Sequence, residues 1–201
     1  MRSFIWFSDR LLYLMNAPEK IAQTYLRLNG FFAIPHFSVL SKEASHIDLL
    51  AVRLGKSEEK IGAEPEFVSL RLDERLFNLL GISKDDTVGL VVEVKGGENE
   101  HGEISREKFD YAALFFGDLR KVFRVVFERS VREFHKRGNY ENRYFVIPII
   151  CCMEFIENRF KEMKEIELKL KRTGVLSKQG SWYLSEEFLS ELIYLRSLGF
   201  E

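Results

Sequence analysis

Residues 87–97 read TVGLVVEVKGG, and this run gives the strongest β-strand signal in the chain. Its valines favour extended backbone, because β-branched side chains pack well on a pleated sheet. Successive side chains of a strand point to opposite faces, so Glu93 and Lys95 share one face while Val92 and Val94 share the other. A carboxylate and an ammonium are therefore expected side by side where the strand ends. The two glycines that follow leave room for a phosphate backbone to approach.

A second acidic side chain, Asp48, lies in another strand-like run, HIDLLAVRL at residues 46–54. An ionised carboxylate among apolar residues is costly to bury unless a cation or hydrogen-bond donors compensate it. The preceding run FFAIPHFSVL, residues 31–40, also indicates a strand, and the polar turn between the two predicts a hairpin. Pro35 favours an edge position or a bulge for the first strand.

A helix is predicted before the hairpin, from Asn16 as its cap to Gly30 as its stop signal. Pro18 fits the first turn, and Glu19 stands three residues after the cap. Downstream, we expect an insertion at about residues 55–87 with a short helix around LDERLFNLL. The remaining expected elements are helices at about 106–116 and 118–136, a buried strand RYFVIPIICC at 143–152, and helices at about 153–172 and 185–198.

These elements predict an α/β fold in the order helix, three strands, helix, strand, followed by a helical tail. Residues 1–152 would form the core and residues 153–201 a C-terminal helical extension. A chain of 201 residues with 46% hydrophobic content can close a sizeable core, and its net charge of −1 indicates no overall affinity for polyanions. The adjacent Cys151 and Cys152 have no disulfide or zinc spacing, and the apolar opening of the chain is interrupted by charges. A soluble, cytoplasmic protein without membrane association is expected.

Asp48 and Glu93 could form a hard oxygen site for Mg²⁺ or Mn²⁺ if they converge on one point, with Lys95 positioning a water molecule. These are the parts needed to hydrolyse a phosphodiester. Structural explanations compete with this interpretation. Glu93 and Lys95 could be the solvent face of an edge strand, Asp48 could be bonded to backbone amides, and Glu19 could be only a helix cap.

The residues Asp48 in HIDLLAV and Glu93-Val94-Lys95 in VVEVKGG resemble the motif of the PD-(D/E)xK nuclease superfamily, which includes restriction endonucleases and archaeal Holliday junction resolvases. The resemblance implies a restriction endonuclease-like core and a Mg²⁺- or Mn²⁺-dependent endonuclease acting on DNA. It also implies that Asp48, Glu93 and Lys95 are catalytic, and that Glu19, Asp48 and Glu93 hold the metal. The chain departs from the pattern at Ile47, which stands where the family has proline, and in the long segment before Glu93.

A basic stripe is expected on the predicted helix 118–136, opposite an apolar face. Its members, expected to contact the nucleic-acid backbone, are Lys121, Arg124, Arg129, Arg132 and Lys136. An ordinary solvated face is the simpler explanation of the same pattern. Two other functions also fit the sequence: a non-catalytic nucleic-acid-binding accessory protein of the same fold, and a protein-interaction domain that pairs through the charged helix at 153–172. A homodimer is among the expected partners.

Overall fold

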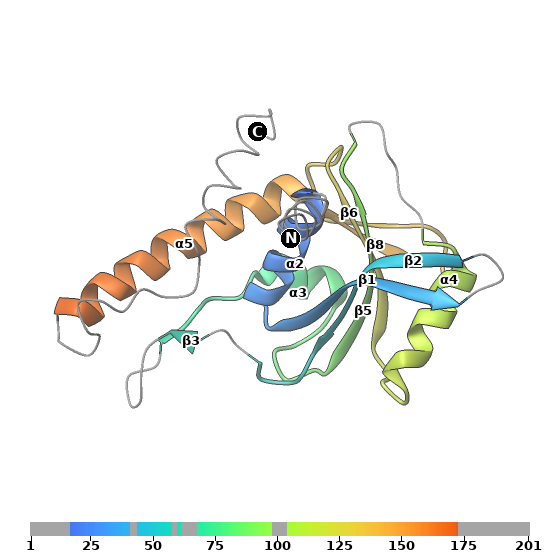
Figure 1. Ribbon diagram of the computed structural model, residues 1–201, viewed down its shortest axis with the longest axis horizontal. Coiled ribbons are helices and arrows are strands. Elements are labelled where there is room, and N and C mark those ends of the chain that lie inside the picture. Colours follow the sequence, from blue (N-terminus) through green and yellow to red (C-terminus); the bar gives the residue numbers. More distant parts are fainter. Residues whose placement is uncertain (1–16, 41–43, 58–59, 62–67, 98–103, 173–201) are drawn as a thin grey trace, which may run out of the picture.

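The chain folds into an α/β structure around a mixed, open six-stranded sheet; the computed structural model describes residues 17–40, 44–57, 60–61, 68–97 and 104–172. Its helices are α2 (Ala17–Leu28), α3 (Glu74–Leu80), α4 (Arg106–Ala113) and α5 (Ile149–Arg172), with a 3₁₀ turn η1 (Leu114–Phe116). Its strands are β1 (Phe31–Leu40), β2 (Ala44–Arg53), β3 (Lys60–Ile61), β4 (Val68–Ser69), β5 (Val88–Lys95), β6 (Val122–Glu128), β7 (His135–Arg137) and β8 (Tyr144–Pro148) (Figure 1).

The strand order in the large sheet is β1-β2-β5-β6-β8-β7. Strand β2 is antiparallel to both of its neighbours, β1 and β5. Strands β5, β6 and β8 run parallel, and β7 is antiparallel to β8. The predicted hairpin of β1 and β2 is confirmed, and so is the strand that carries Glu93 and Lys95. The segment between β2 and β5 contributes α3 and the separate pair β3–β4, and it does not interrupt the order of the larger elements.

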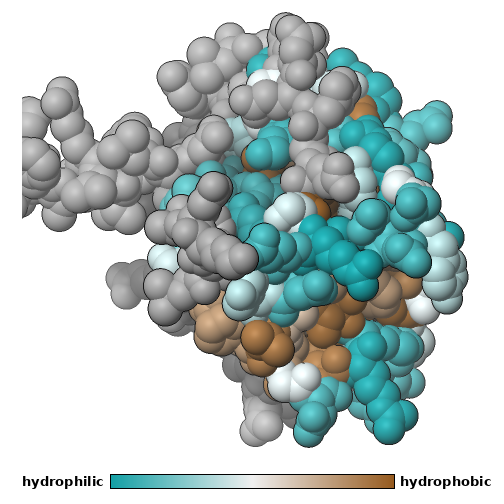
Figure 2. All heavy atoms as spheres, turned by 90° about the vertical axis from the view of Figure 1, so that its right-hand side faces the viewer, coloured by the Kyte–Doolittle hydropathy of each residue, from teal (hydrophilic) through white to brown (hydrophobic). Residues whose placement is uncertain are grey.

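Apolar side chains cover both faces of the sheet. On one face α2, α3 and α5 pack over residues such as Leu49, Val92 and Phe127, with Tyr25 and Ile156 fully buried between them. Each large apolar side chain buried in this way contributes roughly 1.5–3 kcal/mol. The other face is covered by the short α4 and η1. Apolar atoms remain exposed there, near the edge strand β1 (Figure 2); the large ones are Phe32, Ile34, Leu114 and Phe115.

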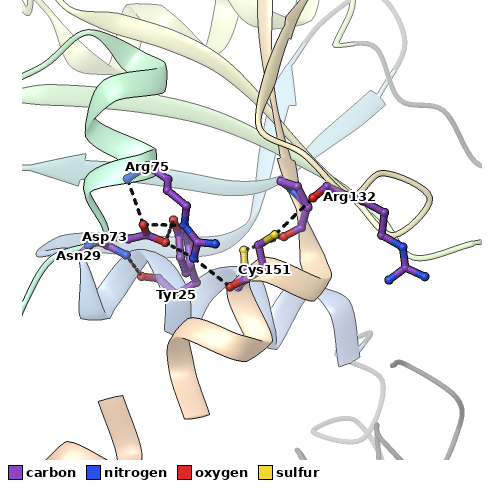
Figure 3. Close-up of polar contacts among 8 residues, drawn as sticks. Tyr25, Asn29, Asp73, Arg75, Arg132 and Cys151 are labelled. Atoms are coloured by element: carbon purple, nitrogen blue, oxygen red, sulfur yellow. Dashed lines mark hydrogen bonds and ion pairs between the residues drawn. The ribbon is translucent and has the colours of Figure 1, made fainter. Parts of the chain in front are cut away.

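A buried polar network ties α3 to the two helices beside it (Figure 3). The Tyr25 hydroxyl donates to Asp73 Oδ2 at 3.0 Å, and the Asp73 amide donates to Asn29 Oδ1 at 2.7 Å. Asp73 also caps α3, because its carboxylate accepts from the amide and guanidinium of Arg75. The same guanidinium reaches Cys151 O on α5. This network fixes the segment that separates β2 from β5, and burial raises the pKa of Tyr25 well above its ordinary value.

The prediction of a helix at 118–136 is wrong, because this range contains strand β6 and the start of β7 and no helical residue. Phe123, Val125 and Phe127 pack on the α2 side of the sheet, whereas Val126 packs on the α4 side, as the period of two requires. The strand predicted at 143–152 ends at Pro148, and α5 begins at the next residue.

The first turns of α5 pack into the main core, so the predicted boundary at residue 152 falls inside a helix. The helices predicted at 106–116 and around residues 72–80 are present as α4 with η1 and as α3. The cap at Asn16 and the helix predicted at 185–198 lie outside the described residues. Across the described ranges, no helix combines the length and apolarity needed to cross a membrane.

Candidate acidic site

The site begins where β2 and β5 stop pairing. Their ladder ends at Leu49 opposite Val92, and the next bond is made by a side chain, because Asp48 Oδ2 accepts the Val94 amide at 2.7 Å. This bond compensates part of the cost of a carboxylate that is only 9% exposed. The second oxygen, Oδ1, lies 4.0 Å from His46 Nε2. Asp48 is thus anchored at the point where the two strands stop pairing.

Glu93 is even less exposed, at 6%, and two ammonium groups face it. Lys95 Nζ lies 3.7 Å from Oε2, and Lys108 Nζ from the first turn of α4 contacts Oε1. Ser105 caps α4 by accepting the Lys108 amide, which sets where that helix begins. Lys108 belongs to the site although the sequence reasoning missed it. No local pattern marks this lysine, because it contacts Glu93 only when α4, which follows β5 in the chain, packs back against the sheet.

Glu19 enters the same site from the first turn of α2. Its Oε2 atom is buried without a hydrogen-bond partner among the described residues, and His36 Nε2 lies 3.6 Å from it. His36 has a φ of +51°, in the left-handed region that few residues other than glycine adopt. It stands opposite Asp48 in the β1–β2 register, between the pairs Pro35–Leu49 and Phe37–Ile47. Backbone strain of this kind, a positive φ at a residue other than glycine, is found most often at functional sites, where the surrounding structure stabilises it.

The electrostatics link the three carboxylates. Burial raises the pKa of Glu19, and the charge of Asp48 raises it further, followed by that of Glu93, while His36 and His46 act in the opposite direction. Burial also raises the pKa of Glu93, because the bond from Lys108 does not fully offset it and Asp48 adds repulsion. The four residues selected from the sequence, Glu19, Asp48, Glu93 and Lys95, thus lie near enough for their charges to interact.

A pH dependence follows from the raised pKa values of Glu19 and Glu93. Below about pH 4.3, the ordinary value for glutamate, both groups are neutral in the folded and unfolded chain. As the pH rises above that value the unfolded chain loses these protons first, so the contribution of the two groups to stability falls until the folded protein also ionises. In urea unfolding with EDTA, wild type should lose stability relative to Glu19→Gln/Glu93→Gln as the pH rises above about 4.3. A difference that stays constant with pH would contradict this.

The donor chemistry of the site suits a divalent cation such as Mg²⁺ or Mn²⁺. Carboxylate oxygens are the ligands these ions prefer, and the buried, unpartnered Glu19 Oε2 is an atom that a cation would satisfy. The described part of the chain nevertheless contains no three side chains already placed to coordinate a metal. Lys108 contacts Oε1 of Glu93 instead. Binding of a metal by all three carboxylates would require this ammonium to move away.

The five cations predicted to bind nucleic acid do not lie on one helical face. Lys121 pairs with Asp86 at 2.7 Å, and Arg124, only 5% exposed, donates to Ile104 O from within β6. Arg129 and Arg132 follow β6, and Lys136 on β7 lies over the Phe145 ring. The stripe that motivated their selection is absent, so their role in nucleic-acid binding stays a prediction without that support.

No family model, curated protein or solved structure matches this chain.

Proposed function

We propose that the protein is a Mg²⁺- or Mn²⁺-dependent endonuclease of the PD-(D/E)xK type that hydrolyses phosphodiester bonds in DNA. The observation that carries the proposal is the convergence of Asp48 and Glu93 where β2 and β5 diverge, with Lys95 beside Glu93. The order α2-β1-β2-β5-α4-β6 supports it, because it is the order of elements that the resemblance implies. Glu19 adds a third carboxylate from the first helix, where the resemblance places one.

The roles of the residues follow from their surroundings. Glu19, Asp48 and Glu93 would hold the metal, which would supply positive charge to the phosphate and acidify a bound water. Lys95 is 30% exposed, so its ammonium can reach solvent while staying near Glu93. It would donate hydrogen bonds that orient the attacking water. The amide of Val94 would keep the Asp48 carboxylate fixed during this step.

Lys108→Met should separate the role of this lysine from that of Lys95. Without this ammonium, the buried Glu93 carboxylate faces Asp48 with only the more distant Lys95 to compensate it, so the metal-free protein should lose about 2 kcal/mol of unfolding free energy. Mg²⁺ should bind about 10-fold more tightly, because it no longer competes with Lys108. Urea unfolding and titration calorimetry measure the two effects, with the exposed Lys164→Met as control. Weaker Mg²⁺ binding would contradict the competition.

The proposed activity is tested by a cleavage panel of single-stranded, duplex, flapped and four-way DNA with Mg²⁺ or Mn²⁺. Cleavage of at least one substrate by wild type, absent with EDTA and absent in Asp48→Asn, is the expected result. Loss of cleavage in that variant guards against a contaminating nuclease. No cleavage of any substrate would reject the enzyme.

A second candidate function is a non-catalytic nucleic-acid-binding protein of the same architecture. The observation that favours it is the ion pair of Lys108 with Glu93, which neutralises a carboxylate that catalysis would need. In that protein the acidic cluster would be a structural remnant, and the Lys108–Glu93 pair would fasten α4 to β5. Nucleic-acid binding that is indifferent to Mg²⁺ and to Asp48→Asn, without cleavage, would identify this function.

A further inference from the structure

A hollow of about 250 Å³ lies beside α4, away from the acidic site. Its lining includes Phe109 of α4, Val122 and Phe123 of β6, and Phe145 of β8. Its rim is formed by Arg106 on α4 and by the turn between β7 and β8. A hollow of this size is below the roughly 300–1,000 Å³ of drug-sized ligand sites, and suits a single planar ring.

Charged side chains, three arginines and two acidic residues, line this hollow. The buried Arg124 guanidinium lies 5.4 Å from the Phe109 ring and donates to two carbonyls, Ile104 O and Glu141 O. Carbonyl oxygens carry no formal charge, so these bonds leave a positive potential in the hollow. Arg106 and Arg143 are exposed at the rim. The carboxylates of Asp110 and Glu141 also line it, and Asp110 lies 3.7 Å from Arg106.

The turn presents an aromatic ring to solvent. Gly138 has a φ of +87°, and Asn139 Oδ1 accepts the Asn142 amide at 2.9 Å, which fixes the shape of the turn. Between them Tyr140 is 87% exposed, with the Arg143 guanidinium 5.7 Å from its ring. An exposed tyrosine beside an arginine, at the rim of this hollow, has the chemistry of a stacking platform for a nucleobase.

We propose that this surface binds an unpaired nucleotide of the DNA substrate, with the base stacked on Tyr140 over the hollow and the adjoining phosphate held by Arg143 and Arg106. The inference rests on the proposed function. Helix α4 connects the two places, because Lys108 reaches Glu93 while its neighbour Phe109 lines the hollow. A base in a duplex is stacked within the helix and cannot stack on Tyr140. The subsite would therefore select single-stranded or flapped DNA over blunt duplex.

The test is fluorescence anisotropy of full-length protein with single-stranded and blunt duplex DNA of the same sequence, in EDTA so that cleavage does not interfere. Tyr140→Ala should weaken binding of the single strand about 5- to 100-fold, as expected for one lost stacked base, and leave duplex binding unchanged. Tyr140→Phe keeps the ring and should bind like wild type. Tyr111→Ala, at an exposed tyrosine of α4 outside the hollow, is the matched control.

A 2-aminopurine base in the single strand gives a direct signal, since stacking on Tyr140 should quench its fluorescence in wild type and in Tyr140→Phe but not in Tyr140→Ala. Equal affinity of wild type and Tyr140→Ala for the single strand would overturn the subsite. So would an equal loss on single strand and duplex. Either result would leave the proposed nuclease intact, because cleavage depends on the acidic site. Binding of single-stranded DNA that depends on Tyr140, without metal-dependent cleavage of any substrate, would instead reject the proposed nuclease and leave the subsite standing.

Discussion

Asp48→Asn is expected to abolish saturable binding of Mg²⁺ and, with it, all metal-dependent cleavage. The substitution removes a charge from the cluster but keeps an oxygen that can accept the Val94 amide, so the junction of β2 and β5 should survive. Repulsion from Glu19 and Glu93 also disappears, and the metal-free protein should be unchanged or more stable by up to about 1 kcal/mol. Titration calorimetry with Mg²⁺ and urea unfolding in EDTA measure the two effects.

The control is Asp110→Asn, at an exposed aspartate of α4 outside the acidic cluster, which should bind Mg²⁺ like wild type. Wild-type affinity for Mg²⁺ in Asp48→Asn would exclude this carboxylate from a metal site. A large loss of stability in the variant would instead show that the charge itself, and not only the accepted hydrogen bond, holds β2 to β5.

Lys95→Ala should lower the single-turnover cleavage rate by ~100-fold or more while nucleic-acid affinity stays nearly intact. A group that positions or activates water in the transition state affects the rate and not ground-state binding. If Lys95 merely balanced the charge of Glu93, its loss would matter little, since partly exposed ion pairs contribute about 0–1 kcal/mol. Lys95→Arg should not restore the rate, because a planar guanidinium cannot replace a compact ammonium.

This measurement uses saturating Mg²⁺ and the best substrate of the cleavage panel. Lys161→Ala, at an exposed lysine on α5, serves as the control and should cleave at the wild-type rate. Equal rates for wild type, Lys95→Ala and Lys95→Arg would remove Lys95 from the mechanism. If Lys108 partly replaces Lys95 in the Lys95→Ala variant, the double variant Lys95→Ala/Lys108→Met should cleave more slowly than Lys95→Ala.

Local sequence patterns were sufficient to predict α2, the β1–β2 hairpin and β5, because the apolar residues of each segment recur with a single clear period. Alternation along β5 also placed Glu93 and Lys95 on one face, whereas the approach of Asp48 to Glu93 depends on the pairing of β2 with β5 and was expected only from the resemblance. Lys108 could not be found in this way. Its contact with Glu93 depends on how α4 crosses back over the sheet, which is set by tertiary packing.

The error at residues 118–136 came from an ambiguous apolar run. VFRVVFE in β6 has apolar residues at both strand and helix spacings, so its periodicity alone does not distinguish them. Two observations favoured the strand: the valines, which prefer extended backbone, and the short length of the run. Pro148 likewise marked the end of β8, since proline has no amide to continue a ladder, and the apolar residues after it begin a buried helix.

The bond between Asp48 and Val94 joins residues 46 positions apart, and this separation bears on how the protein acquires its site during folding. The β1–β2 hairpin closes over a short turn and can form within microseconds. The β2–β5 and β5–β6 pairings must instead close long loops, and sheets of such nonlocal contacts form in milliseconds to seconds. A newly synthesised chain would therefore hold a formed hairpin well before its carboxylates converge, and the proposed nuclease would remain inactive until folding is nearly complete.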